Sequence, residues 1–181
     1  MCAEKSVAIV GHSLVPRDVG TVDGAKITTY RCPGAKASSF ESSPLSRVLQ
    51  WPHDLTILFI GGNDVFDGCI PRNIAQDIEA VVESIHAYCH SHIALVLLEH
   101  RNPPLDNRFN VTPAQYRKVV NNINGRLKRK YRAKPYVQFL SVGAKPFQHG
   151  VTDEIHFNKE AQFHLRLKFR NAIRYFVQNN Q

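Results

Sequence analysis

The chain has 181 residues, of which 43% are hydrophobic and 21% charged, and its formal net charge is +8. This is the composition of a globular protein with enough residues to bury a full core, and we expect one domain over residues 1–181. No apolar run approaches membrane-spanning length, and the N-terminus lacks the apolar core and cleavage site of a signal peptide, so we expect an intracellular, cytoplasmic location and no transmembrane segment. The four cysteines show no CxxC pairing, which fits a reducing compartment.

Short apolar runs rich in β-branched residues predict buried strands. The first run, Val7–Val10, ends abruptly in Gly11-His12-Ser13. The other predicted strands cover residues 25–31, 55–60, 93–98 and 135–142. The second is ended by Cys32-Pro33-Gly34-Ala35, and the third runs into Gly61-Gly62-Asn63-Asp64. Polar or glycine-containing segments therefore follow several of the predicted strands.

Helices are predicted between these strands from capping residues and from apolar spacings of three and four. A short helix follows Ser43, the expected N-cap, with Pro44 at its first position. A long amphipathic helix over residues 71–89 is expected to bury Ile74, Ile78, Val81, Val82, Ile85 and Tyr88. Thr112-Pro113-Ala114-Gln115 opens another helix, with an apolar face made of Tyr116, Val119, Val120, Ile123 and Leu127. Asn158 is the expected N-cap of a final helix that buries Leu165, Phe169, Ile173 and Phe176.

The alternation of strands and helices predicts a three-layer α/β/α sandwich with a five-stranded, mainly parallel sheet of flavodoxin-like type. In such a sheet, ligands bind beyond the carboxyl ends of the strands. Four short motifs are expected at or beside that edge. In chain order they are Gly11-His12-Ser13, Cys32-Pro33-Gly34, Gly62-Asn63-Asp64 and Asp153-Glu154-Ile155-His156.

Together, in this order and spacing, the motifs resemble the four signature blocks of the SGNH (GDSL-type) hydrolase superfamily, which is named for its Ser, Gly, Asn and His. Gly-His-Ser, Arg-Cys-Pro-Gly-Ala-Lys and Ile-Gly-Gly-Asn-Asp-Val also resemble the esterase modules of some LINE-type retrotransposon proteins. The resemblance implies a serine esterase that hydrolyses a small acyl-ester or lipid substrate through an acyl-enzyme. It implies no metal and no organic cofactor.

By this resemblance Ser13 is the nucleophile, His156 is its base and Asp153 orients the imidazole. The oxyanion would be held by the backbone N–H groups of Ser13 and Gly34 and by the side-chain amide of Asn63. Asp and His three residues apart in one turn can face a single reaction centre. Glycine at position 34 would let substrate approach the backbone closely.

One residue departs from the family pattern: His12 stands where the family usually has Asp. That aspartate is not a triad member, so catalysis is still expected, but the hydrogen bonding around the serine must differ. Asp64 is expected to anchor its turn.

Each site residue also has a structural interpretation. Ser13 could be a helix N-cap and His156 a surface histidine, while Asn63 and Gly34 could serve only as turn residues. His86, His90 and His92 suggest a metal site, although histidines near a helix C-terminus are also favoured by the helix dipole. Choosing between these interpretations needs the tertiary structure.

A basic cluster ends the helix that begins at Pro113: Arg126, Lys128, Arg129, Lys130, Arg132 and Lys134. It predicts contact with nucleic acid or an anionic membrane, although cations there also complement the helix dipole. The second functional hypothesis is therefore a catalytically weak module that binds RNA or membrane. Because a helix ends at the sheet edge opposite the strands' carboxyl ends, we expect this cluster to lie away from the motifs.

Overall fold

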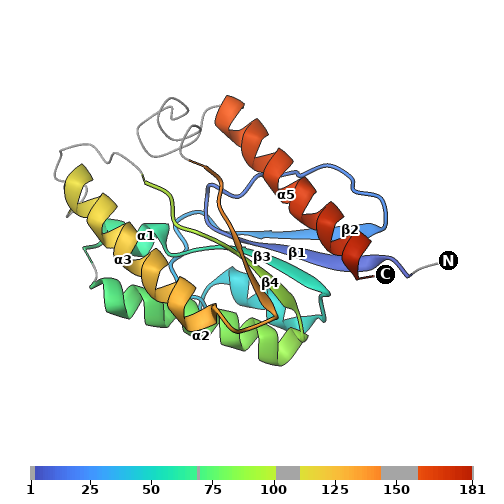
Figure 1. The fold of residues 1–181 in the computed structure, drawn as a ribbon, viewed down its shortest axis with the longest axis horizontal. Coiled ribbons are helices and arrows are strands. Elements are labelled where there is room, and N and C mark those ends of the chain that lie inside the picture. Colours follow the sequence, from blue (N-terminus) through green and yellow to red (C-terminus); the bar gives the residue numbers. More distant parts are fainter. Residues whose placement is uncertain (1–2, 69, 101–110, 144–158, 181) are drawn as a thin grey trace.

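The computed structural model describes residues 3–68, 70–100, 111–143 and 159–180. Within these residues one parallel sheet has the order β2-β1-β3-β4-β5. Its strands are β1 (Lys5–Gly11), β2 (Ala25–Arg31), β3 (Leu55–Phe59), β4 (His92–Val96) and β5 (Val137–Leu140). The helices are the 3₁₀ helix η1 (Pro44–Gln50) and the α-helices α1 (Gly62–Phe66), α2 (Pro71–Cys89), α3 (Pro113–Tyr131) and α5 (Lys159–Asn179). The predicted α/β/α architecture with a five-stranded sheet is confirmed (Figure 1).

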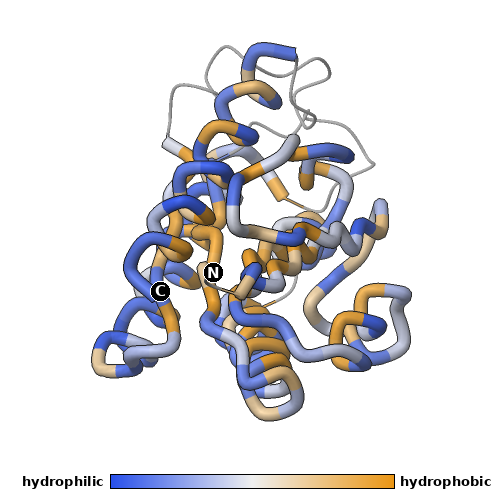
Figure 2. Tube along the Cα trace, turned by 90° about the vertical axis from the view of Figure 1, so that its right-hand side faces the viewer, coloured by the Kyte–Doolittle hydropathy of each residue, from blue (hydrophilic) through white to orange (hydrophobic). Residues whose placement is uncertain are grey.

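The central strands β1, β3 and β4 are buried on both faces of the sheet, and the helices divide between these faces. Alternate residues of a strand point to opposite faces. Ala8 and Val10 of β1 pack with η1, α2 and α3, whereas Val7 and Ile9 pack with α5. In Figure 2 the apolar residues gather along the strands and on the sides of the helices that face them. Burial on both faces explains why these central strands appear in the sequence as nearly continuous apolar runs.

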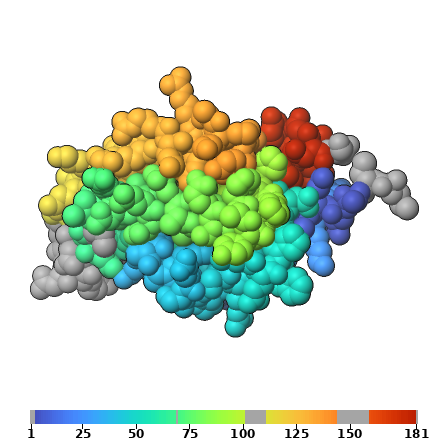
Figure 3. All heavy atoms as spheres, turned by 90° about the horizontal axis from the view of Figure 1, so that it is seen from below, coloured from blue at the N-terminus to red at the C-terminus, as the bar shows by residue number. Residues whose placement is uncertain are grey.

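Helix α2 lies between α3 and η1 and contacts both (Figure 3). Its bounds match the predicted ones, and five of the six residues expected to be buried are buried. Tyr88 is the exception, because 71% of this residue is exposed, while its neighbour Cys89 is buried. Tyr88 lies at the margin of the apolar arc, and the Cys89 thiol lies inside it, where it donates to the Val48 carbonyl at 3.4 Å. The expectation for Tyr88 was therefore wrong.

The predicted helix starts are largely confirmed. Thr112 and Gln115 form the capping box, with the Thr112 side chain accepting from the Gln115 N–H at 3.3 Å. Ser43 caps the helix that begins at Pro44 by accepting from the Leu45 N–H at 3.2 Å, although that helix is 3₁₀. The expected N-cap Asn158 lies outside the described residues.

Strand β1 ends at Gly11 between two neighbouring strands, where no side chain fits. A Cβ atom there would lie 2.1 Å from the carbonyl oxygen of Phe59 on β3. On the other side, the Gly11 carbonyl accepts from the Cys32 N–H at 3.0 Å, just after β2. Glycine therefore lets the ends of β1, β2 and β3 lie close together. The segments that follow these three strands consequently start at neighbouring positions.

Candidate active site

Three of the predicted motifs follow three adjacent strand ends. Gly11 pairs with Arg31 of β2 and with Phe59 of β3, so the three strands end level with one another. The chain passes from β1 outward to β2 and then returns to β3 on the other side, which makes the β1–β3 boundary the switch point of the sheet. Crevices at such switch points are the usual ligand sites of open α/β sheets. Ser13 and Asn63 flank this boundary.

Ser13 is half-buried in the turn that follows β1. Arg31 holds this turn: its Nη2 donates to the Ser13 carbonyl at 2.8 Å, and its Nε donates to the Val15 carbonyl at 3.0 Å. Neither the N–H nor the hydroxyl of Ser13 has a hydrogen-bond partner among the described residues. The turn therefore fixes the serine backbone and leaves its donors available.

His12, the departure from the family pattern, is completely buried. Its Nδ1 accepts the Leu14 N–H at 3.3 Å, and its ring packs against Phe59 with centroids 4.8 Å apart. An imidazole nitrogen that accepts a hydrogen bond carries no proton, so the ring proton is assigned to Nε2. A histidine can thus supply an acceptor next to the serine without a carboxylate.

Gly34 lies in an exposed turn closed by a hydrogen bond from the Ala35 N–H to the Cys32 carbonyl at 3.1 Å. Its φ of +77° belongs to the left-handed region, which glycine adopts without strain. A Cβ atom there would meet nothing within 4 Å, so the backbone conformation and not crowding within the protein requires glycine. Among the described residues, nothing accepts the Gly34 N–H.

Asn63 and Asp64 tie the loop of Gly34 to the end of β3. Asn63 lies in the short helix α1, which the sequence analysis missed, and its Nδ2 donates to the Ala35 carbonyl at 2.9 Å. One of the two Nδ2 hydrogens makes this bond, and the second remains available. The buried Asp64 carboxylate accepts from the Ala37 N–H at 2.9 Å and from the Ser38 N–H and hydroxyl at 3.2 and 2.8 Å. Asp64 is therefore the structural anchor that was predicted.

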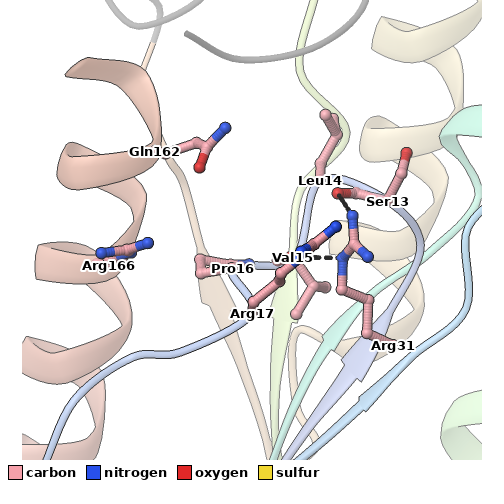
Figure 4. A pocket seen from close by; sticks show the side chains of 8 residues that line it. All are labelled: Ser13, Leu14, Val15, Pro16, Arg17, Arg31, Gln162 and Arg166. Atoms are coloured by element: carbon pink, nitrogen blue, oxygen red, sulfur yellow. Dashed lines mark hydrogen bonds between the residues drawn. The ribbon is translucent and has the colours of Figure 1, made fainter. Parts of the chain in front are cut away.

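A cavity of about 400 Å³ opens beside Ser13. The turn after β1, the end of β2 and α5 all contribute to its walls (Figure 4). Its lining residues among those described are Ser13, Leu14, Val15, Pro16, Arg17, Arg31, Gln162 and Arg166. The volume suits a small-molecule ligand.

The model of the family "GDSL-like Lipase/Acylhydrolase" matches residues 13–165 of the chain. The chain belongs to this family. The match begins at Ser13 and spans the Gly34, Asn63 and His156 blocks. The protein is accordingly a carboxylic ester hydrolase. No curated protein sequence matches it.

Solved structures of esterases share the fold of this chain. An aryl esterase from M. smegmatis has a TM-score of 0.73 at 15% identity, with 95% of this chain and 99% of that chain covered. A carbohydrate acetylesterase from Sinorhizobium meliloti has a TM-score of 0.71 at 16% identity, with 93% and 98% covered. At these identities the likeness concerns the fold.

Asp153 and His156 lie outside the described residues, so their roles remain predictions. On the N-terminal side of these residues, the described chain stops at Gly143. Glu99, which the sequence analysis did not single out, holds this end. The Glu99 carboxylate follows β4 and accepts the Val142 N–H at 2.9 Å and the Gly143 N–H at 3.3 Å, just after β5. Burial raises the pKa of Glu99, and these two N–H groups oppose the shift.

The basic cluster occupies the opposite edge of the sheet. Helix α3 ends at Tyr131, and the Tyr136 carbonyl accepts from the Ile93 N–H at 2.7 Å, where β4 and β5 begin. The cations that follow Arg126 are exposed there: Lys128, Arg129, Lys130, Arg132 and Lys134. The expected separation of this cluster from the Ser13 edge is therefore present.

The histidines near the end of α2 have other roles in the fold. His86 stacks on Tyr136 with centroids 3.7 Å apart, and its Nδ1 donates to the Ser91 carbonyl at 3.1 Å. His90 ends α2 in the left-handed conformation. Across the described residues, no three His, Cys, Asp or Glu side chains gather as metal ligands would. Nor does any helix in that part of the chain have the length and apolarity needed to cross a membrane.

Proposed function

We propose that the protein is a serine esterase that cleaves a carboxylic ester with a short acyl group, with Ser13 as nucleophile. The observation that carries the proposal is the arrangement at three adjacent strand ends. Ser13 lines a cavity there and its hydroxyl is unpaired among the described residues, and the Gly34 N–H is likewise unused. The Asn63 amide is tied to the residue after Gly34 and keeps one hydrogen available.

In the first half of the reaction, the Ser13 Oγ attacks the ester carbonyl carbon and its proton passes to His156. Asp153 orients the imidazole and stabilises its charged form. The N–H groups of Ser13 and Gly34 and the Asn63 amide donate to the oxyanion. The tetrahedral intermediate then breaks its bond to the alcohol oxygen, and His156 returns the proton to the leaving alcohol.

In the second half, water attacks the acyl carbon of the Ser13 ester and gives its proton to His156. The bond between the acyl carbon and Oγ breaks, Oγ regains the proton, and the carboxylic acid leaves. The cavity of about 400 Å³ supports a small acyl group, and so does the acetyl ester named for the Sinorhizobium meliloti neighbour.

The exposed cations at the opposite edge favour a second activity, binding of RNA or of an anionic membrane surface, as proposed from the sequence.

The test of the esterase is labelling with a fluorophosphonate probe together with turnover of para-nitrophenyl acetate. Ser13→Ala should abolish labelling and lower kcat by about four decades or more, because nucleophile and base act as a unit. Ser39→Ala, at an exposed serine that does not line this cavity, is the control. A folded Ser13→Ala variant that keeps wild-type turnover contradicts the proposal.

A further inference from the structure

We propose that the cavity beside Ser13 binds an anionic oxyacid group, a carboxylate or a phosphate, carried by the ester substrate. Arg17 and Arg166 would be the residues that recognise it, beside the fixed guanidinium of Arg31. The inference deepens the proposed function and rests on it, because it takes Ser13 as the nucleophile.

The charge of the cavity wall is the first argument. Arginines reach it from three separate elements: Arg17 from the loop after β1, Arg31 from the end of β2, and Arg166 from α5. In Figure 4, Arg166 extends from α5 on the side of the cavity opposite Arg31. No carboxylate is among the described lining residues. Guanidinium groups that converge without acidic partners create a positive potential that attracts an anion.

The availability of the donors is the second argument. Arg17 and Arg166 are exposed, and neither forms a hydrogen bond or ion pair with another described residue. Arg31 differs, because its Nε and Nη2 hold the backbone of the Ser13 turn. Arg31 is thus a positioning residue, and Arg17 and Arg166 offer their full sets of donors to a ligand. Such groups bind carboxylates and phosphates through paired hydrogen bonds.

The position of Ser13 in the lining of the same cavity is the third argument. Ser13, Arg17 and Arg166 line one cavity of about 400 Å³. A substrate whose ester reaches Ser13 can therefore carry the anionic group that Arg17 and Arg166 bind. The anion therefore belongs to the substrate and sets its specificity. Further along α5, Arg170 and Arg174 line a separate hollow with Asp23, and this hollow does not include Ser13.

The test compares acetate release from aryl acetates that differ only in a remote group. The neutral ester is para-acetoxybenzamide, and the anionic esters are para-acetoxybenzoate and para-acetoxyphenyl phosphate. We expect kcat/KM to be higher for at least one anionic ester than for the neutral one, and the larger ratio identifies carboxylate or phosphate as the group recognised. In the double variant Arg17→Gln/Arg166→Gln, this ratio should fall about tenfold to hundredfold, as for the loss of charged hydrogen bonds. Circular dichroism checks that the variant is folded.

Arg174→Gln is the matched control, because it removes an arginine from α5 outside the cavity and should leave the ratio unchanged. An unchanged ratio in the double variant overturns the inference, as does a wild-type protein that prefers the neutral ester. In either case the proposed function stands if the wild-type protein hydrolyses the neutral ester and the Ser13→Ala variant does not. A wild-type protein that hydrolyses none of the three esters contradicts both.

Discussion

The two residues on either side of Ser13 are joined by a hydrogen bond, in which the Leu14 N–H donates to Nδ1 of His12 at 3.3 Å. The bond spans the candidate nucleophile and holds the turn from within, while Arg31 holds it from outside. The aspartate usual in the family has carboxylate oxygens that could accept the same N–H. A buried imidazole supplies an acceptor here without burying a charge, which would be costly at a fully buried position.

Replacing His12 tests whether this acceptor sets the pose of the serine. His12→Leu removes it and leaves the Leu14 N–H without this partner, at a cost of about 1–3 kcal/mol in the free energy of unfolding. We expect kcat on para-nitrophenyl acetate to fall at least about tenfold, as for other small displacements of a catalytic group. His12→Asn offers an amide oxygen to the same N–H and should keep the higher kcat of the two variants. Equal kcat values in folded His12→Leu and His12→Asn would show that the acceptor is irrelevant to catalysis.

Substitutions at the neighbouring residues Asn63 and Asp64 should affect different properties, kcat at Asn63 and stability at Asp64. Asn63→Ala should lower kcat by about two to three decades, as expected for one oxyanion donor. Its stability should change by only about 1 kcal/mol, because a single half-buried hydrogen bond to Ala35 is lost. Steady-state kinetics and urea unfolding of the same preparation measure both quantities. A kcat at the wild-type level would leave Asn63 as a loop anchor only.

Asp64→Ala is the complementary case. It removes the acceptor of three hydrogen bonds from a fully buried position and leaves the Ala37 N–H without this partner. We expect the free energy of unfolding to drop by about 3 kcal/mol or more. Asp64→Asn, which keeps one oxygen acceptor, should lose less, as measured by urea unfolding. If Asp64→Ala unfolds at the wild-type urea concentration, the loop is held by other contacts.

His53 gives the protein a pH-dependent stability. Burial lowers the pKa of His53 from its usual 6.5, and nearby Asp54 opposes the shift. The folded state therefore binds fewer protons than the unfolded state. The stability that neutral His53 contributes is fully present above its pKa in the unfolded state. It is lost as the pH falls through the lowered pKa of His53 in the folded state. We expect the free energy of unfolding to decrease as the pH falls below the usual histidine pKa of 6.5.

The matched variant is His53→Phe, which keeps a ring against Tyr30 and removes the titrating group. It also removes the contact of His53 Nδ1 with the Ser6 hydroxyl, so its absolute stability is expected to be lower. The slope of its unfolding free energy against pH should be shallower than that of the wild-type protein. Parallel slopes would assign the acid sensitivity to other groups.

The basic cluster and Ser13 should serve separate activities, because they lie at opposite edges of the sheet. The triple variant Lys128→Gln/Arg129→Gln/Lys130→Gln should weaken binding to RNA or to anionic vesicles and leave turnover of para-nitrophenyl acetate within about twofold of wild type. Ser13→Ala should do the reverse. The wild-type affinity should fall steeply with salt, because counterion release dominates binding to polyanions. Loss of both activities in either folded variant would show that the two surfaces are one site.

The sequence by itself determined the elements and their order. Short apolar runs and apolar spacings of three and four are local properties, so the strands and the bounds of α2 were predictable within a few residues. The Thr112 capping box is equally local, because both partners lie within one turn. The four motifs could be matched to a family for the same reason: each is contiguous in the chain. The roles of Asp153 and His156 rest on that match alone.

Only the tertiary structure decided which residues from distant elements meet. Arg17, Arg31 and Arg166 line one cavity because a turn, a strand end and a helix converge there, and no local pattern links them. The contact of His12 with Phe59 and the exposure of Tyr88 likewise depend on what packs against each residue. Periodicity specifies which face of an element is apolar, but the extent of that face and its neighbours are set by long-range packing. That packing places the arginines beside Ser13.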